Sequence, residues 1–492
     1  MRQVPWSEAP GGLAGPAGPA EARAAGAEAR PGKLQGRVLA QVLFCALAPT
    51  LLLAGGRAHL AARAFWVVFF LLAFHAVVSK RHIELICLAV GLSPFINLFR
   101  AFAFYNLVSV LFGAIVLHAY LREPIGARLA LRRNRLAVAL TAFVTIYYLA
   151  TLAVTRQYFV ALRFYDFAFA MLGILVIGRR LGPLSAALRG ITVSACAVGA
   201  AMLPHVRSDS PDRLGLIFLE GMSLGNPVQL GVPLALAFLA LVVDRGRWLD
   251  LEGRPGLRLL LGFPTVVLLA MTTSRASWLV ASAGVLVTLL FGHRQRLRML
   301  LAIGLGLLAV QLVLLSAFGP MVQKGLDRTF GENRTAGQRS SGRSDQWLVA
   351  QYAFSRSFGS VVHGYGPGSG VAVYDNFSPQ VEGVLLVGRA AFHSLFMHIG
   401  IETGLLGLVP LLVWLLIAGR RILIGTRRTR VILPLVCFAS YVLIVMTVSG
   451  NDTVSGTYLG IALLAAMKPS EAVRPTATYK AERRLRPAQA SA

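Results

Sequence analysis

The sequence predicts an all-α, polytopic integral membrane protein with about 12–14 transmembrane helices and one large loop between them. Of its 492 residues, 56% are hydrophobic and only 14% are charged, and the mean hydropathy is +0.66. A soluble domain carries about 25% charged residues, so a surface this poor in charge would not be solvated by water. Apolar runs of about 20 residues, the length that crosses a bilayer, fill most of the chain from Val38 to Met467.

Fourteen apolar runs separated by polar or charged breaks are expected to form the membrane-spanning helices. The runs are Val38–Gly55, His59–Val78, Ile83–Phe99, Ala101–Tyr120, Leu136–Thr155, Tyr158–Gly178, Leu184–Leu203, Leu214–Val243, Gly256–Met271, Ser277–Phe291, Leu297–Phe318, His393–Ala418, Val431–Val448 and Val454–Met467. No clear polar break separates the third and fourth runs, which meet around Arg100, so twelve spans fit the pattern equally well.

The net charge of +27 would suit a nucleic-acid-binding protein, but the distribution of the basic residues argues against that class. They lie in short loops between apolar runs, with five arginines between Arg122 and Arg135 and five more between Arg420 and Arg430. Loops rich in arginine and lysine stay on the cytoplasmic side of a membrane. The predicted partner is therefore the lipid bilayer, with no nucleic acid.

The composition divides the chain into five parts. They are a disordered, basic cytoplasmic arm at 1–36, a transmembrane helical region at 37–318, a large outer loop at 319–391, C-terminal transmembrane helices at 392–467 and a basic cytoplasmic tail at 468–492. The arm is rich in Ala, Gly and Pro, which is typical of disorder, and it lacks the apolar core of a signal peptide. A loop as long as 319–391 is usually functional.

The outer loop is rich in aromatic residues. They are Trp347, Tyr352, Phe354, Phe358, Tyr365 and Tyr374. Such side chains suit packing or stacking on sugars, and we expect packing for most of them.

Arg275 is predicted to occupy a tight outer turn between two helices. Ser274 is placed to cap the second helix, which puts Arg275 in the first turn, where the positive end of the helix dipole disfavours a cation. A bound anion would reverse that penalty. An arginine that reaches to phospholipid headgroups explains the position equally well.

His393 begins a pattern of residues spaced by four and three, continued by Met397, Gly400, Gly404 and Gly407. This spacing predicts one helical face, along which the glycines let a second helix approach closely. A neutral histidine there has the chemistry of a general base, although a lone histidine more often bonds a loop carbonyl.

Two further groups are more simply explained as structural. Arg343 lies in the segment Gly342-Arg-Ser-Asp-Gln-Trp347 and by itself predicts only a solvated charge or an ion pair with Asp345. His398 and Glu402 are one helical turn apart and are expected to form a pair within the membrane.

Several short motifs occur in a fixed order along the second half of the chain. They are Gly225-Asn226-Pro227, Thr273-Ser274-Arg275-Ala276, Gly342-Arg343 through Trp347, Gly364-Tyr-Gly-Pro-Gly368, and His393-Ser394 followed after nine residues by Gly404-Leu-Leu-Gly407. This series resembles the bacterial O-antigen ligases and the O-antigen and exopolysaccharide polymerases of the same superfamily. Ser394 departs from the asparagine that this family often has after the histidine.

The resemblance implies a membrane glycosyltransferase of lipopolysaccharide or exopolysaccharide biosynthesis in the bacterial cytoplasmic (inner) membrane, with its active site facing the periplasm. It implies a polyprenyl-diphosphate-linked (undecaprenyl diphosphate) glycan donor and an acceptor hydroxyl on lipid A core, another glycan or a protein. Transfer would invert the anomeric carbon and would require neither a metal nor a cofactor. The implied catalytic residues are Arg275, Arg343 and His393, and the implied substrate-binding residues are Ser274, Asn226, Trp347 and Ser394.

A polytopic transporter or flippase of lipid-linked glycans is the alternative. Transporters place ionisable residues near the middle of the membrane, and Arg163, Asp166 and Glu220 lie within predicted spans. The large outer loop favours the enzyme, and no internal repeat is visible in the sequence. A local ion pair would also explain Arg163 and Asp166.

Overall fold

The computed structural model describes residues 31–99, 134–155, 158–178, 180–206, 217–219, 222–292, 296–316, 343–382, 392–447 and 453–466, together with isolated positions between them. Over these residues the regular structure is helical apart from one short hairpin. Five of the described helices are long and apolar enough to cross a membrane, and shorter apolar helices accompany them. The predicted fold class, an all-α polytopic membrane protein, is confirmed.

The elements follow the chain in this order: α2 (Pro31–Ala54), α3 (Ala58–Val78), α4 (His82–Gly91), α5 (Ser93–Leu98), α8 (Arg135–Thr155), α9 (Tyr158–Ile177), α10 (Leu181–Met202), η2 (Leu203–His205), β1 (Ile217–Leu219), β2 (Met222–Leu224), α11 (Pro227–Val242), η3 (Val243–Leu249), α12 (Pro255–Met271), α13 (Arg275–Phe291), α14 (Arg296–Leu314), α17 (Arg343–Phe354), α18 (Phe358–His363), α19 (Gly370–Phe377), η5 (Ser378–Gln380), α20 (Leu395–Thr429), α21 (Leu433–Thr447) and α22 (Thr453–Leu464). Helix α2 contains the last six residues, 31–36, of the arm that was predicted to be disordered. The rest of that arm, most of the predicted span Ala101–Tyr120 and the tail at 468–492 lie outside the described residues.

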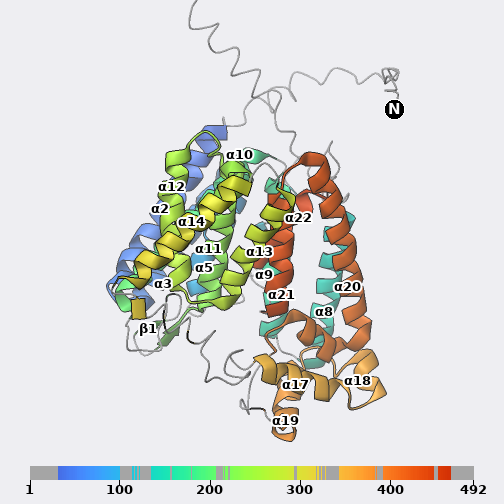
Figure 1. The fold of residues 1–492 in the computed structure, drawn as a ribbon. Coiled ribbons are helices and arrows are strands. Elements are labelled where there is room, and N and C mark those ends of the chain that lie inside the picture. Colours follow the sequence, from blue (N-terminus) through green and yellow to red (C-terminus); the bar gives the residue numbers. More distant parts are fainter. Residues whose placement is uncertain are drawn as a thin grey trace, which may run out of the picture.

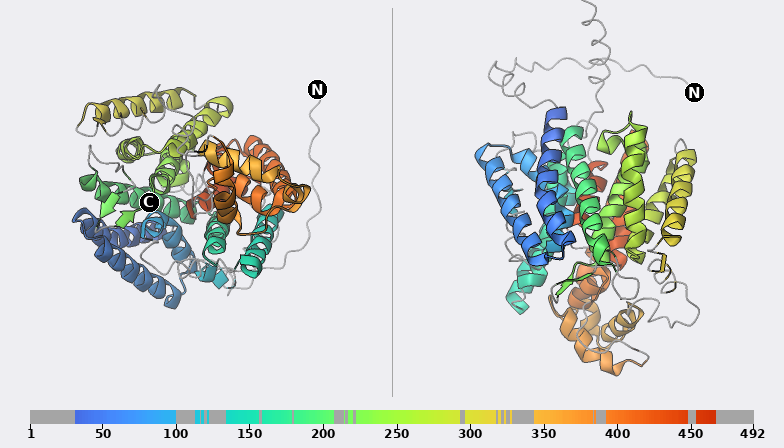
Figure 2. Two further views of the ribbon diagram at one scale, coloured as in Figure 1. Left: turned by 90° about the horizontal axis from the view of Figure 1, so that it is seen from below. Right: turned by 90° about the vertical axis from the view of Figure 1, so that its left-hand side faces the viewer.

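The long helices form a bundle, and three short helices form a cap at one end of it. Figure 1 shows α17, α18 and α19 together beyond the end of the bundle where α20 begins. Seen from that end, the cap covers the part of the bundle near α20 and leaves the helices of the N-terminal part uncovered (Figure 2). We call the segment from α17 to η5 the cap.

The outer surface of the bundle is apolar, as contact with lipid requires. Phe44, Phe74 and Leu416 are each more than 60% exposed. Inside the bundle, small residues bring helices close together: a Cβ on Gly190 of α10 would lie 2.8 Å from the Cα of Gly91 on α4. Close approach at small residues is how membrane helices gain packing energy where the hydrophobic effect is weak.

The predicted span Ile83–Phe99 is wrong as a single helix, because the structure divides it into α4 and α5 at Leu92. Pro94 explains the break: it has no N–H to donate to the carbonyl of Val90, so the hydrogen-bond ladder of α4 stops there.

The predicted span Leu214–Val243 is wrong over its first part. Strands β1 and β2 form an antiparallel hairpin, and the helix begins only at Pro227. Gly225 adopts a positive φ of +73°, which a helix does not allow. Asn226 then caps α11, and Pro227 occupies its first turn, the position that proline prefers.

Helix α20 differs from its prediction in two ways. It runs to Thr429 instead of Ala418, and it is interrupted at Gly404, where φ is +61° and ψ is −154°. The predicted single face from His393 to Gly407 is therefore wrong, because its members belong to two helical segments. The cause is contact with the cap: a Cβ on Gly404 would lie 2.5 Å from the carbonyl carbon of Val362.

Asp244 fixes the start of α21 at the opposite end of the bundle from the cap. It is 8% exposed and has a left-handed backbone, with φ +51°. Its carboxylate accepts hydrogen bonds from the backbone N–H groups of Ile432 (3.0 Å) and Leu433 (2.9 Å) and from Nε1 of Trp248 (3.1 Å). A carboxylate suits this position because the first N–H groups of a helix have no partner within the helix.

Replacing Asp244 with alanine is expected to lower the thermal stability of the protein. The substitution leaves buried donors without an acceptor, at about 1–3 kcal/mol for each buried group. Thermal unfolding in detergent measures the effect. The unfolding temperature of Asp244→Asn is expected to lie between those of the wild type and Asp244→Ala. Glu252→Ala is the control, since Glu252 is an exposed carboxylate nearby in the chain. If Asp244→Ala and Glu252→Ala unfold at the same temperature, the capping role of Asp244 is wrong.

Candidate active site

Arg275 stands at the start of α13, directly after the tight turn that follows α12. Ser274 is the N-cap of α13, and its Oγ accepts from the backbone N–H of Ser277 (3.4 Å) and from the Oγ of Ser277 (2.9 Å). The predicted cap is confirmed. Thr273, just before it, has a φ of +48°, which is strained for a β-branched residue. The backbone that aims Arg275 is therefore held by its surroundings.

Helix α11 packs against this turn. A Cβ on Gly231 would lie 2.3 Å from the Oγ of Ser277, so only glycine lets α11 approach this closely. Asn226 is exposed at the start of α11, and its Oδ1 accepts from the N–H of Val228 (2.9 Å). The observed role of Asn226 is that of a helix cap, and a substrate contact remains a prediction.

Arg343 is the first residue of α17 and is half-buried. One turn later, the buried side chain of Gln346 accepts a hydrogen bond from the backbone N–H of His393 (2.9 Å). This bond fixes α17 to the chain just before α20. Gln346 was not expected to take part, because no motif marks a glutamine whose partner lies 47 residues away.

The structure brings Arg343 near both Arg275 and His393. Partial burial lowers the pKa of Arg343, and the positive charge of Arg275 lowers it further. The protein around His393 removes part of its water and lowers its pKa, and the charge of Arg343 adds to that effect. The guanidinium of Arg343 thus lies near enough to Arg275 and to His393 for their charges to interact, and the imidazole of His393 favours its neutral form. The arrangement can bind an anion and accept a proton next to it.

The other two predicted substrate-binding residues differ in what they contact. Trp347 lies one helical turn after Arg343 on the same face of α17 and is 53% exposed. Ser394 is buried as the N-cap residue of α20, with its Oγ 3.5 Å from the carbonyl of Val445 on α21. Trp347 is available to a substrate, whereas the observed contact of Ser394 is to the bundle. Substrate contacts by both remain predictions.

Most aromatic residues of the cap pack, as predicted. The ring of Tyr374 is fully buried and meets Phe392 edge-on at 5.7 Å, and Tyr365 meets Phe377 at 5.7 Å. Phe358, in contrast, is 84% exposed. The cap therefore shares a small apolar cluster with Phe392 and the first turns of α20.

The expected pair of His398 and Glu402 is present in α20, with Nε2 of His398 3.2 Å from Oε1 of Glu402. The partners of Glu402 outside its own helix could not be read from the sequence, and they are described below.

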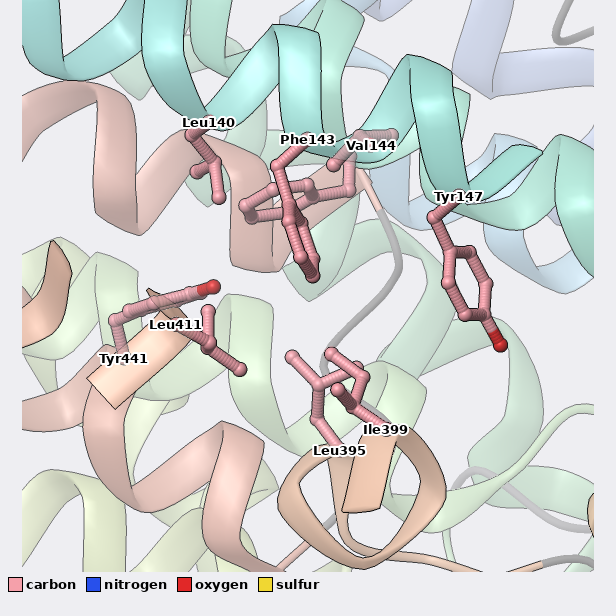
Figure 3. A pocket seen from close by; sticks show the side chains of 9 residues that line it. Leu140, Phe143, Val144, Tyr147, Leu395, Ile399, Leu411 and Tyr441 are labelled. Atoms are coloured by element: carbon pink, nitrogen blue, oxygen red, sulfur yellow. The ribbon is translucent and has the colours of Figure 1, made fainter. Parts of the chain in front are cut away.

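An apolar pocket lies among α8, α9, α20 and α21. One of its lining residues, Leu395, follows His393 by two positions. It is lined by Leu140, Phe143, Val144, Tyr147, Phe167, Leu395, Ile399, Leu411 and Tyr441. Figure 3 shows the ring of Phe143 and the hydroxyl of Tyr441 turned toward the middle of the pocket, and the hydroxyl of Tyr147 turned away from it. No charged side chain lines this pocket, so the charged chemistry belongs to Arg275, Arg343 and His393.

The residues that suggested a transporter leave that alternative a prediction. The side chain of Arg163 and all of Glu220 lie outside the described residues, and Asp166 is buried within α9.

Comparison with known families gives one result. Residues 260–412 match the O-antigen ligase family, a range that includes Arg275, Arg343 and His393. None of the curated proteins compared with the chain shows a significant match. The predicted resemblance is confirmed over the matched range.

Proposed function

We propose that this chain, an O-antigen ligase-like membrane protein, transfers a glycan from an undecaprenyl-diphosphate-linked donor to an acceptor hydroxyl on the periplasmic side of the bacterial inner membrane. Gln346, one turn after Arg343 on α17, bonds to the backbone N–H of His393. The observation that carries the proposal is the resulting position of Arg343 near both Arg275 and His393. They come from the bundle, the cap and the start of α20, so the site forms only where these parts join.

The two arginines are proposed to bind the diphosphate of the donor. Each guanidinium offers a planar fork of N–H donors that matches phosphate oxygens. Arg275 also stands at the positive end of α13, where a cation is unfavourable until an anion arrives. Both charges would stabilise the diphosphate as it leaves.

His393 is proposed to act as the general base. Its lowered pKa keeps the imidazole neutral and able to accept the proton of the acceptor hydroxyl. The acceptor oxygen then attacks the anomeric carbon from the face opposite the diphosphate. The bond from that carbon to the phosphate oxygen breaks, and its electron pair leaves with the diphosphate. The anomeric configuration is inverted, and the two guanidinium groups supply the positive charge without a metal or cofactor.

The remaining predicted residues would shape the substrate site. Trp347 offers an exposed indole one turn from Arg343, suited to stacking against a sugar ring. Ser274, Asn226 and Ser394 would act mainly through the turns and helix starts that they form.

Three activities are compatible with this site, and they differ only in the acceptor. With lipid A core as acceptor the protein is an O-antigen ligase, with another lipid-linked glycan it is an O-antigen or exopolysaccharide polymerase, and with a protein hydroxyl it is a protein glycosylase. We place the ligase first, because the spacing from His393 to Gly407 fits the ligase signature.

A test in the source bacterium compares alanine variants of Arg275, Arg343 and His393 at equal membrane levels. Surface polysaccharide is resolved by gel. Loss of long-chain polysaccharide from the acceptor is expected in all three variants: a ligase would leave lipid A core uncapped, and a polymerase would leave single repeat units.

Arg356→Ala is the matched control. The guanidinium of Arg356 lies 4.3 Å from the ring centre of Tyr352 and bonds to Oε1 of Gln380 (2.8 Å), so it is a cap arginine engaged within the cap. Normal transfer by all three site variants would refute the proposed function.

A further inference from the structure

Glu402 is a fully buried carboxylate on α20, nine residues after His393. Its Oε2 accepts from the N–H of Gly368 (2.6 Å) and from the hydroxyl of Tyr147. Its Oε1 accepts from the N–H of Gly370 (3.0 Å) and lies near His398. One side chain thus contacts the cap, α8 and its own helix.

The backbone of α20 is joined to the cap at the same place. The interruption at Gly404 leaves the carbonyls of Ile401 and Glu402 available to partners outside the helix, and they accept from the N–H groups of Tyr365 and Gly366, both at 2.9 Å. Gly364 allows this approach, because a Cβ there would lie 2.6 Å from the carbonyl carbon of Glu402.

Beside the apolar contacts between the cap and α20, two sets of hydrogen bonds among the described residues attach the cap to α20. The first is Gln346, which bonds to the backbone of His393, and the second is the loop from Gly364 to Gly370, held by Glu402. Arg343 belongs to the cap and His393 to the start of α20, so the orientation of the cap decides where the guanidinium lies relative to the imidazole.

The chemistry of the second attachment requires a carboxylate. Each oxygen of Glu402 faces two groups able to donate, four in all. A glutamine has only one acceptor oxygen, and its NH₂ group would face two of those donors. A buried donor that faces another donor has no acceptor, and such an unsatisfied group destabilises the fold.

We infer that Glu402 is a positioning residue for the proposed glycan transfer: its carboxylate holds the glycine loop of the cap on α20 and thereby sets Arg343 beside His393. Glu402 contacts neither reacting group and acts through the orientation of the cap. The inference rests on the proposed function, whereas the attachment of the cap can be tested without it.

The test measures cap orientation and catalysis separately in the full-length protein. Spin labels are placed at Phe358→Cys in the cap and Leu416→Cys on α20, two exposed positions. Cys196 is replaced by serine, and the other three cysteines are buried. Electron–electron resonance then gives the distance distribution between the labels. Steady-state kinetics with a lipid-linked glycan donor is measured on the unlabelled chain.

Glu402→Gln is expected to broaden the label distances and to lower kcat about 10- to 100-fold, since misplacement by about 1 Å can cost that much, with KM for the acceptor little changed. Tyr147→Phe removes one donor and is expected to give a smaller change in the same direction, which keeps the test decisive if Glu402→Gln fails to fold. Glu382→Gln, at an exposed carboxylate two residues after the cap, should behave as wild type.

Unchanged distances in both Glu402→Gln and Tyr147→Phe would overturn the inference. Broadened distances with normal kcat would also overturn it, because the attachment would then be irrelevant to catalysis. A wild-type protein that binds lipid-linked glycan but transfers none would refute the proposed function, while the distances would still decide whether Glu402 holds the cap.

Discussion

Replacing Arg343 with alanine is expected to reduce glycan transfer by about 100- to 1,000-fold, the usual loss when one preorganised donor to a developing negative charge is removed. The half-buried position of Arg343 beside Arg275 makes its charge effective on a diphosphate. Arg343→Lys keeps the charge but loses the planar fork, so partial activity is expected. The measurement is kcat and KM with purified protein and a lipid-linked donor.

The control for this prediction is again Arg356→Ala, which should keep wild-type kinetics. Arg275→Ala is expected to cost a similar factor, and the double variant less than the product of the two, because both groups bind one diphosphate. Near-normal kcat in Arg343→Ala would show that the guanidinium does not contact the leaving group.

Replacing His393 with alanine is expected to lower kcat by about 100- to 10,000-fold, the range of general acid–base catalysis. The pH dependence gives the more specific result. Burial first, and the charge of Arg343 second, lower the pKa of His393 from its usual 6.5. The pH at which half of the base is protonated therefore lies below 6.5. Transfer should stay constant through neutral pH and fall as the pH drops through the lowered pKa.

The pH profile of kcat/KM tests this assignment. Residual activity in Arg343→Ala should show its acid limb at higher pH than wild type, because the neighbouring positive charge is gone. The residual activity of His393→Ala should lack this limb. An acid limb above pH 6.5 in the wild-type protein, or one retained in His393→Ala, would assign the titration to another group.

The sequence predicted the parts of the fold that depend on local composition. The length of each apolar run predicts a membrane-spanning helix, and a serine directly before Arg275 predicts a capped helix start. The hairpin of β1 and β2 was missed, since an apolar run of that kind does not distinguish strand from helix until the turn at Gly225 is known. The break at Gly404 was missed for a different reason, because it depends on the backbone of a cap segment 40 residues earlier.

The candidate site divides in the same way. Arg275, Arg343 and His393 were found because each lies in a short motif of a known family. Gln346 and Glu402 join the cap to the region around the start of α20, and most of their partners are long-range backbone N–H groups. Hydrogen bonding to a distant backbone leaves no pattern in the residue types, so these supporting contacts become visible only in three dimensions.

The strained turn before Arg275 has a consequence for how this chain tolerates change. A non-glycine residue held at a positive φ, as Thr273 is, costs of the order of 1–3 kcal/mol. The strained backbone at Thr273 thus lowers the stability of the fold while it orients the side chain of Arg275. Random substitutions that relax this turn would raise stability and impair the aim of Arg275. On the proposed function, selection for stability and selection for catalysis oppose each other at this position.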